Sequence, residues 1–323
     1  MKKLTPRRIK RIGIAAGMSV LILVGALMGL SYGVGYKLAH PQHLPLSSNP
    51  AWWGMRFRNV TFTAPGDSLR LTGWWIPQPG SPLTVIISHG YRNNRVGHSV
   101  PQLAVARALH QMGANVLMFD FRGSGDSDGD LTSVGIFEQQ DLIAANHAVL
   151  TRWAPRSKIV LLGYSMGAST ALMAAAEDSQ VAGVIADSPF ADLTQYLNSH
   201  LSVWTHLPHY PFTPLVLWMM PKVTGVSLNG ASPIKLAGKL GKRPVLLIAG
   251  SKDTIIPSHN SVTLYRRLRV TDPKVTLWMV PWSQHIQAYK VQPMAYVNRL
   301  YQFLMQWDPH LKKPDANSIG FYP

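Results

Sequence analysis

The feature that most constrains the fold is a regular alternation of short apolar runs with helical patterns from residue 83 onward. The runs are rich in β-branched residues, as the buried strands of a parallel sheet are. Parallel neighbours need helical crossovers, so this order predicts an α/β fold, a mainly parallel sheet with helices on both faces. The predicted strands are 83–88, 116–120, 159–163, 182–187, 245–249 and 274–280, and the predicted helices are 101–112, 135–153, 166–176, 258–269 and 293–307.

Two stretches lie outside this rhythm. Residues 56–63 and 69–76 are predicted as strands around the turn-forming sequence APGD. Segment 196–223 is rich in His, Trp, Met and Pro and is too apolar for a simple loop. We therefore expect a helical cap at about 190–230, over the C-terminal edge of the sheet. The alternative is extra core packing without substrate contact.

The N-terminal region predicts a membrane anchor. Residues 1–11 form a basic segment that contains no acidic residue, and residues 12–36 contain no charged residue at all. About 20 apolar residues span a bilayer, and a positive flank stays in the cytoplasm, so 12–36 is expected to be a transmembrane signal anchor with the rest extracytoplasmic. Cleavage near Gly35 and a buried soluble helix are the alternatives.

The remaining boundaries follow from composition. Residues 37–50 carry three prolines and are expected to form a linker, 51–309 one folded domain, and 310–323 a flexible polar tail. The chain has a net charge of +16, which favours an anionic surface such as a membrane or a polyanionic wall, although a generally basic soluble surface has the same composition. No basic helix, zinc spacing or RNA-binding signature indicates nucleic acid. The absence of cysteine excludes disulfides and thiol catalysis.

A serine between two glycines follows one of the predicted strands. The sequence GYSMG at 163–167 stands where strand 159–163 ends and helix 166–176 begins. A Gly-x-Ser-x-Gly turn between a strand and a helix is a nucleophile elbow, which holds the serine hydroxyl above the sheet. Backbone N–H groups at the start of the helix favour negative charge at the same point. The pattern therefore predicts that Ser165 is a nucleophile.

A serine nucleophile needs a histidine base and a carboxylate that orients it. His285 follows the last strand and obeys the chain order Ser, Asp, His, whereas His259 starts a helix before that strand. Asp253, in a loop of small and turn-forming residues, is the expected acid. Asp187, at the end of the preceding strand, is the competing acid, and it is otherwise expected to bond loop N–H groups.

The oxyanion of the transition state needs two N–H donors. One is expected from Met166, which follows the nucleophile, and the other from Tyr91 in the loop SHGYRNNR after strand 83–88. Gly90 lets this backbone come close. His89 is expected to pack under the loop as a structural residue.

The acidic sequence FDFRGSGDSDGD at 119–130 invites a calcium interpretation. A calcium loop that begins at Asp126 would need Gly and Glu where the chain has Leu131 and Phe137. No metal is therefore expected, and Asp120 and Arg122 are expected to hold a glycine-rich turn.

These motifs together carry a resemblance. HGY, DFRGSGDSDG, GYSMG, DSPF, ASPI, GSKDTIIP and the late QH resemble the α/β-hydrolase superfamily, and within it the membrane-anchored bacterial serine hydrolases of the cell-surface type. The resemblance covers about residues 55–307. It implies an eight-stranded sheet with a cap after the sixth strand, and a two-step acyl transfer without metal or organic cofactor. The family's nucleophile, acid and base fall on Ser165, Asp253 and His285.

The expected function is hydrolysis of carboxylic esters, as in carboxylesterases and lipases, through an acyl-enzyme. The substrate is expected to be a small-molecule or lipid-like ester beneath the cap. Four cap residues either line its acyl pocket or form the cap's own core: Trp204, Trp218, Met219 and Met220.

Three alternatives remain. An acyltransferase is possible on the same fold. A serine peptidase of the prolyl-oligopeptidase type usually carries a large N-terminal propeller. Only about 50 residues precede this domain, which argues against that alternative. The third alternative is a catalytically inactive binding protein on the same fold. The presence of Ser165, Asp253 and His285 at the three expected positions argues against it. The sequence does not indicate an oligomeric state.

Overall fold

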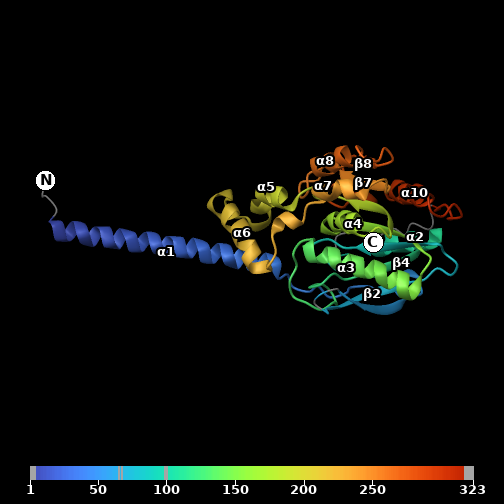
Figure 1. Cartoon of the computed structure of the whole chain (residues 1–323), viewed down its shortest axis with the longest axis horizontal. Coiled ribbons are helices and arrows are strands. Elements are labelled where there is room, and N and C mark those ends of the chain that lie inside the picture. Colours follow the sequence, from blue (N-terminus) through green and yellow to red (C-terminus); the bar gives the residue numbers. More distant parts are fainter. Residues whose placement is uncertain (1–4, 65, 67, 98–100, 316–323) are drawn as a thin grey trace.

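The computed structural model describes residues 5–64, 66, 68–97 and 101–315. A long N-terminal helix projects from a domain in which helices enclose a sheet (Figure 1). The strands are β1 (Arg58–Thr63), β2 (Arg70–Ile76), β3 (Leu83–Ser88), β4 (Asn115–Phe119), β5 (Lys158–Tyr164), β6 (Val181–Asp187), β7 (Val245–Gly250) and β8 (Thr276–Val280). The helices are α1 (Pro6–Ala39), α2 (Gln102–Met112), α3 (Ile136–Ala148), α4 (Met166–Glu177), α5 (Leu193–Thr205), α6 (His209–Thr224), α7 (Pro233–Leu236), α8 (His259–Leu268), α9 (Ala288–Val291) and α10 (Pro293–Leu304). Shorter helical turns are η1 (Pro50–Trp53), η2 (Val149–Trp153), η3 (Leu228–Gly230) and η4 (Ala237–Leu240).

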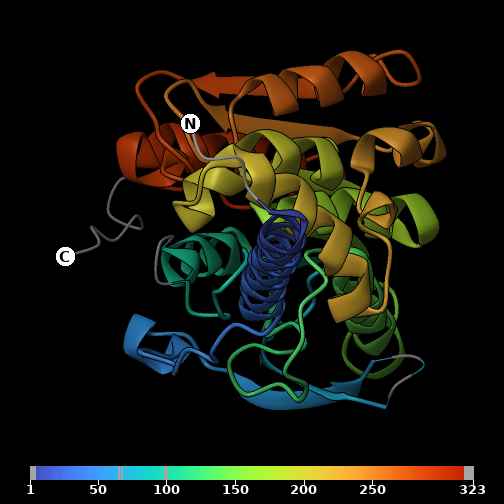
Figure 2. The same cartoon turned by 90° about the vertical axis from the view of Figure 1, so that its left-hand side faces the viewer.

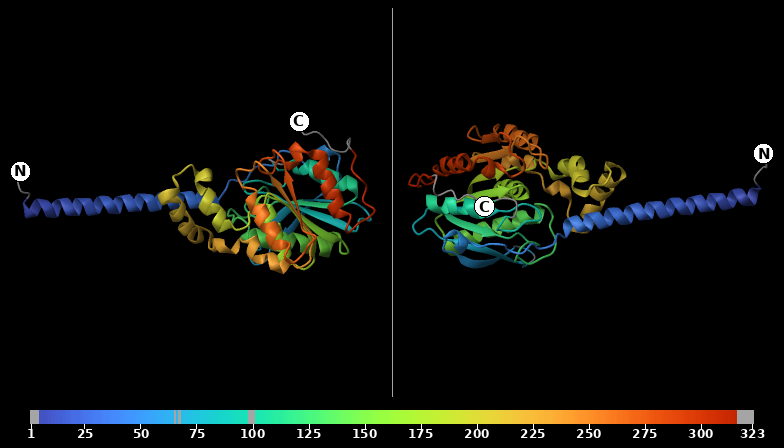
Figure 3. Two further views of the ribbon diagram at one scale, coloured as in Figure 1. Left: turned by 90° about the horizontal axis from the view of Figure 1, so that it is seen from above. Right: turned by 180° about the vertical axis from the view of Figure 1, so that it is seen from behind.

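The strands of the described residues form one eight-stranded sheet in the order β1-β2-β4-β3-β5-β6-β7-β8. β1 pairs with β2, and β2 with β4, in antiparallel fashion, while every pair from β4 to β8 is parallel. Figure 3 shows the strands with helices on both sides. The predicted fold class is confirmed, because each strand boundary lies within two residues of the predicted one.

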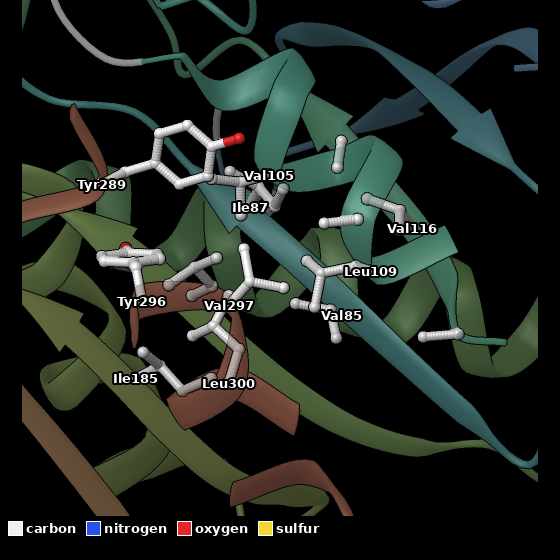
Figure 4. Close-up of a cluster of buried hydrophobic side chains, with 14 of the residues drawn as sticks. Val85, Ile87, Val105, Leu109, Val116, Ile185, Tyr289, Tyr296, Val297 and Leu300 are labelled. Carbon is white, nitrogen blue, oxygen red and sulfur yellow. The ribbon is translucent and has the colours of Figure 1, made fainter. Parts of the chain in front are cut away.

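The strands of the sheet centre are apolar on both faces because helices cover both. In β3, Val85 and Ile87 pack with α2 and α10, which Figure 4 shows as one cluster with Leu109 and Leu300. Ile86, between them, belongs to the opposite cluster with α3, α4 and α8. Side chains of a strand alternate between faces, so a strand buried on both sides is a continuous apolar run.

The predicted cap is present between the sixth and seventh strands. It consists mainly of α5 and α6, which pack against each other at the carboxyl end of the sheet. Its buried side chains, such as Leu201 and Met220, form a third cluster with Phe190 and Ile256 of the domain below. The cap therefore encloses space next to the loops that follow β5, β6 and β7.

Helix α1 is longer than the expected anchor and is not isolated from the domain. It is long and apolar enough to cross a membrane, judged by length and composition. Its last turns lie along α6, where Ser31, Gly35 and Ala39 are buried at four-residue spacing (Figures 1 and 2). A Cβ at Gly35 would lie 3.6 Å from Sδ of Met220, so small residues permit this close packing.

The segments expected as linker and tail contact the domain where the structure describes them. The ring nitrogens of His43 lie 3.0 and 2.9 Å from the carbonyl oxygens of Gly125 and Gly129. In the tail, Leu311 is buried, and the Lys312 N–H donates to a carbonyl of α2 at 2.8 Å. Residues 316–323 of the expected tail lie outside the described residues.

Candidate active site

Ser165 stands at the turn between β5 and α4, as its sequence pattern predicts. Its φ of +56° and ψ of −118° are a strained conformation for a residue other than glycine. The two glycines of the motif allow the turn, because a Cβ at Gly163 would collide with the backbone of Gly167, and one at Gly167 with the backbone of Ser88. The turn at Ser165 is therefore a close packing of backbone on backbone, which only glycine permits.

The structure brings Ser165, His285 and Asp253 together from three loops at the carboxyl edge of the sheet. Nε2 of His285 lies 2.8 Å from Oγ of Ser165, and Nδ1 lies 2.8 Å from Oδ2 of Asp253. Oδ1 of Asp253 accepts the N–H groups of Ile255 and Ile256, each at 2.9 Å. Since a carboxylate only accepts, Nδ1–H of the imidazole donates to it, and Nε2 is left to accept from the serine hydroxyl.

Asp187 lies near this group but does not contact the imidazole. Its carboxylate accepts the hydroxyl of Ser188 at 3.0 Å and that of Tyr296 at 3.2 Å. These side-chain partners correct the expectation that Asp187 bonds loop N–H groups, because α10 carries Tyr296 to the end of β6. Complete burial, the largest cause, raises the pKa of Asp187 to about 7. The Ser188 hydroxyl also accepts the N–H of Ile286 at 3.3 Å, which ties this pair to the loop of His285.

The loop after β3 approaches the serine closely. A Cβ at Gly90 would lie 3.3 Å from Cβ of Ser165, so glycine leaves the space this approach needs. Among the described residues, the N–H groups of Tyr91 and Met166 donate to no protein acceptor. Free backbone N–H groups next to a nucleophile can stabilise an oxyanion, so the role predicted for these two residues stays a prediction.

His89 is structural in its contacts. Its Nε2 accepts the N–H of Phe121 at 3.1 Å, so Nδ1–H donates to the carbonyl of Gly90 at 2.8 Å. Burial lowers the pKa of His89 to about 4, because the imidazolium form has no water around it. The neutral ring therefore supports the loop that carries Tyr91.

The acidic loop at 119–130 is held by ion pairs and backbone donors. Asp120 pairs with the guanidinium of Arg95 and accepts the N–H groups of Arg95 and Asp126 at 2.7 and 2.9 Å. Arg122 forms a buried ion pair with Asp141 of α3 at 2.6 Å. The described residues contain no cluster of three or more His, Asp or Glu suited to a metal ion.

An apolar pocket opens directly above Ser165. Its cavity volume is about 60 Å³, so the pocket is narrow. Its lining includes Ser165 and Met166, and Leu38 of α1 also belongs to it. None of the described residues that line it carries a charge.

Two of the four predicted pocket residues line this pocket. Trp204 and Met220 do so, whereas Met219 is buried elsewhere in the cap and Trp218 is half exposed under the amine of Lys222. The reason is helical periodicity: Val216 and Met220, four residues apart, share the inner face of α6, and 218 and 219 do not.

Other residues that line the pocket were not predicted from the sequence. They include Leu38, Phe190, Tyr196, Leu201, Val216 and Ile256. The four-residue spacing in α5 and α6 was a signal for the cap members among them. Nothing local to Leu38 indicated that the end of the anchor helix would reach the pocket.

Comparison with known proteins agrees with this architecture. Residues 102–308 match the prolyl oligopeptidase family, over more than half of the chain. The uncharacterized protein YqkD of Bacillus subtilis is 31% identical over 236 residues, which cover 72% of this chain and 75% of YqkD. The uncharacterized protein YfhR of Escherichia coli K12 is 29% identical over 239 residues, 72% of this chain and 74% of YfhR.

Among solved structures, the esterase Pf2001 of Pyrococcus furiosus superposes with a TM-score of 0.71 and 29% identity, covering 84% of this chain and 99% of that one. The α/β-hydrolase resemblance is thus confirmed, and the family match includes the type of peptidase that the sequence analysis kept as an alternative. The chain belongs to the prolyl oligopeptidase family and is a serine hydrolase with the α/β-hydrolase fold.

Proposed function

We propose that this protein is a membrane-anchored carboxylesterase with Ser165 as nucleophile, His285 as base and Asp253 as the orienting acid. The observation that carries the proposal is the pair of 2.8 Å contacts that join these three side chains beneath an apolar pocket. This is the geometry that activates a serine hydroxyl at neutral pH. The proposal needs no metal or organic cofactor.

The reaction has two steps. Oγ of Ser165 attacks the ester carbonyl while Nε2 of His285 takes its proton, and Asp253 stabilises the imidazolium. The N–H groups of Tyr91 and Met166 hold the oxyanion of the tetrahedral intermediate. The imidazolium then protonates the departing alcohol, leaving an acyl-enzyme. Water attacks this ester with the same histidine as base, and the carboxylic acid leaves as Ser165 regains its proton.

The pocket supports an ester with an apolar acyl group. Within the part of the chain that the structure describes, its lining has no charged side chain to bind the amino terminus or the charged side chain of a peptide. The esterase activity named for Pf2001, at 29% identity, points in the same direction. Family membership alone supports a peptidase as the second candidate, so an amide analogue belongs in the test.

Helix α1 supports anchoring by a single span. Arg7, Arg8, Lys10 and Arg11 precede its uncharged part, so this flank stays in the cytoplasm and the domain is extracytoplasmic. Protease added to intact spheroplasts is then expected to degrade the domain. Protection of the domain until the membrane is lysed would contradict this topology.

The test uses the full chain in detergent micelles with a fluorophosphonate probe and p-nitrophenyl esters of increasing chain length. We expect Ser165→Ala to abolish labelling and to lower kcat by a factor on the order of 10⁶. Asp253→Asn is expected to cost on the order of 10⁴, because the wrong imidazole tautomer is favoured.

Asp187→Asn is the matched control for the acid. It removes a buried carboxylate near His285 that does not touch the imidazole, so a loss below about tenfold is expected. A larger loss for Asp187→Asn than for Asp253→Asn would reverse the assignment of the acid. Absence of labelling and of ester turnover in the wild type would overturn the esterase proposal, and faster turnover of p-nitroanilides than of esters would favour the peptidase.

A further inference from the structure

The outer surface of the cap has an unusual composition. Residues 193–221, a run of 29 that forms α5 and most of α6, contain no Asp, Glu, Lys or Arg. Apolar and aromatic side chains are exposed there instead: Val203 at 50%, Trp204 at 37%, Tyr210 at 76% and Trp218 at 53%. Helices on the surface of a soluble domain carry charged residues on their outer face. We call these four exposed residues the cap surface.

The cap surface lies beside the part of α1 that leaves the membrane. If Arg11 marks the cytoplasmic headgroups, about 20 residues cross the hydrocarbon, so α1 emerges near Ser31. From Ser31 to Ala39 the helix is packed on α6 (Figures 1 and 2). Tyr32 and Tyr36 are exposed on this stretch, as aromatic residues at a membrane interface are. The cap is therefore held at the level of the outer headgroups.

Two cations lie at the outer end of this stretch. Val223 is 3.9 Å from the Cβ position of Gly35, so Lys222 on α6 and Lys37 on α1 stand at a similar level. Both are exposed, and they are the first charged residues after the two apolar segments. Lysines at this depth attract the phosphates of lipid headgroups. Along α1 and the cap, apolar surface is followed by Lys37 and Lys222. This order matches the hydrocarbon core and then the headgroup layer of a bilayer.

The pocket above Ser165 shares a residue with the cap surface. Trp204 belongs both to the pocket lining and to the exposed cap surface, so it stands at the mouth. Leu38 also lines the pocket, and its carbonyl accepts the hydroxyl of Tyr91 at 2.6 Å. The end of the anchor is thus part of the pocket, and the mouth is within reach of the lipid around α1.

We propose that the cap surface lies in the outer interface of the bilayer, and that the substrate is a glycerophospholipid whose acyl chain passes from the membrane beside Trp204 into the pocket. This inference rests on the proposed esterase function. Ser165 attacks the acyl carbonyl, the acyl C–O bond breaks, and His285 protonates the glycerol oxygen, which releases a lysophospholipid. Water then cleaves the acyl-enzyme to a free fatty acid.

The experiment uses the full chain reconstituted in vesicles of phosphatidylglycerol and phosphatidylethanolamine. Fatty acid release from the vesicle lipid and turnover of water-soluble p-nitrophenyl butyrate are measured in the same preparation. The test variant is Val203→Glu with Trp218→Glu. The matched control is Val270→Glu with Trp52→Glu, because these two residues are each 74% exposed and lie outside the cap.

We expect the wild type to release fatty acid from the vesicles, and the cap variant to lower the ratio of lipid to butyrate turnover about tenfold, because two carboxylates at the interface oppose insertion. The control variant is expected to keep the wild-type ratio.

Butyrate turnover without any release from the vesicles would overturn this inference and leave the esterase proposal standing. An equal fall in the ratio for both variants would also overturn it, since the effect would then be one of charge in general. Absence of turnover on both substrates would overturn the esterase proposal and this inference with it.

Discussion

His89 illustrates how one buried side chain supports a site without taking part in the chemistry. The ring donates to the carbonyl of Gly90 and accepts from Phe121, so it joins the loop after β3 to the loop after β4. Together the two hydrogen bonds require the neutral ring with its proton on Nδ1, because Nε2 can accept only when it carries no proton. The loop that carries Tyr91 therefore depends on the protonation state of a residue that the substrate does not touch.

The stability of the domain should consequently depend on pH through His89. Its folded pKa of about 4 lies below the ordinary 6.5, so between these values the unfolded chain binds a proton that the folded chain does not. The stabilising contribution is present above pH 6.5 and is lost as the pH falls toward 4, by up to about 3 kcal/mol. Unfolding midpoints of wild type and His89→Gln at pH 7.5 and 5 measure this. A fall in the midpoint that is as steep in the variant would contradict the prediction.

At the scale of elements, the cap shows that a helix face decides which residues meet a substrate. Val216 and Met220 point from α6 into the pocket, whereas Trp218 on the same helix points to the surface. Composition alone placed all the large cap side chains in one group. The turn of 100° per residue separates them into a pocket face and an outer face.

Enlarging a residue on the pocket face should shorten the preferred acyl chain. Val216→Phe is expected to lower kcat/KM for long-chain p-nitrophenyl esters about tenfold relative to the butyrate, because the larger ring fills space in the pocket. Leu215→Phe, on the same helix but outside the pocket lining, is the control. The comparison is the chain-length profile of kcat/KM, and an identical profile for both variants would show that α6 does not bound the acyl site.

At the scale of the whole molecule, α1 forms part of the pocket wall as well as being the proposed membrane anchor. Its small residues Ser31, Gly35 and Ala39 let it lie close to α6, and Leu38 completes the pocket. A domain cut free behind the anchor therefore lacks part of the surface that faces the substrate.

Two truncations separate these roles. A chain that begins at residue 30 keeps the contacts of α1 with the cap, whereas a chain that begins at residue 40 loses them and the carbonyl partner of Tyr91. We expect the shorter chain to have about tenfold lower kcat/KM for long-chain esters and a lower unfolding midpoint, because apolar cap surface is newly exposed. Equal activity and midpoint for the two chains would show that α1 is a tether only.

The sequence by itself determined the α/β fold class, the elbow at Ser165 and the positions of Asp253 and His285 in the chain. These depend on local periodicity, on the steric freedom of glycine and on the rules of chain connection, all of which are readable from neighbouring residues. The 2.8 Å contacts among those side chains lie beyond such rules, whereas the catalytic roles were predicted from them and stay a proposal.

Only the tertiary structure decided the partners of Asp187, the outward position of Trp218 and the part that Leu38 has in the pocket. Asp187 meets Tyr296 across 109 residues, and Tyr91 meets Leu38 across 53. Such contacts arise when separate elements pack side by side, and no short stretch of sequence encodes which side chain another element will bring. The pocket is formed by the anchor, the cap and the sheet together, and so its walls became visible only in the folded molecule.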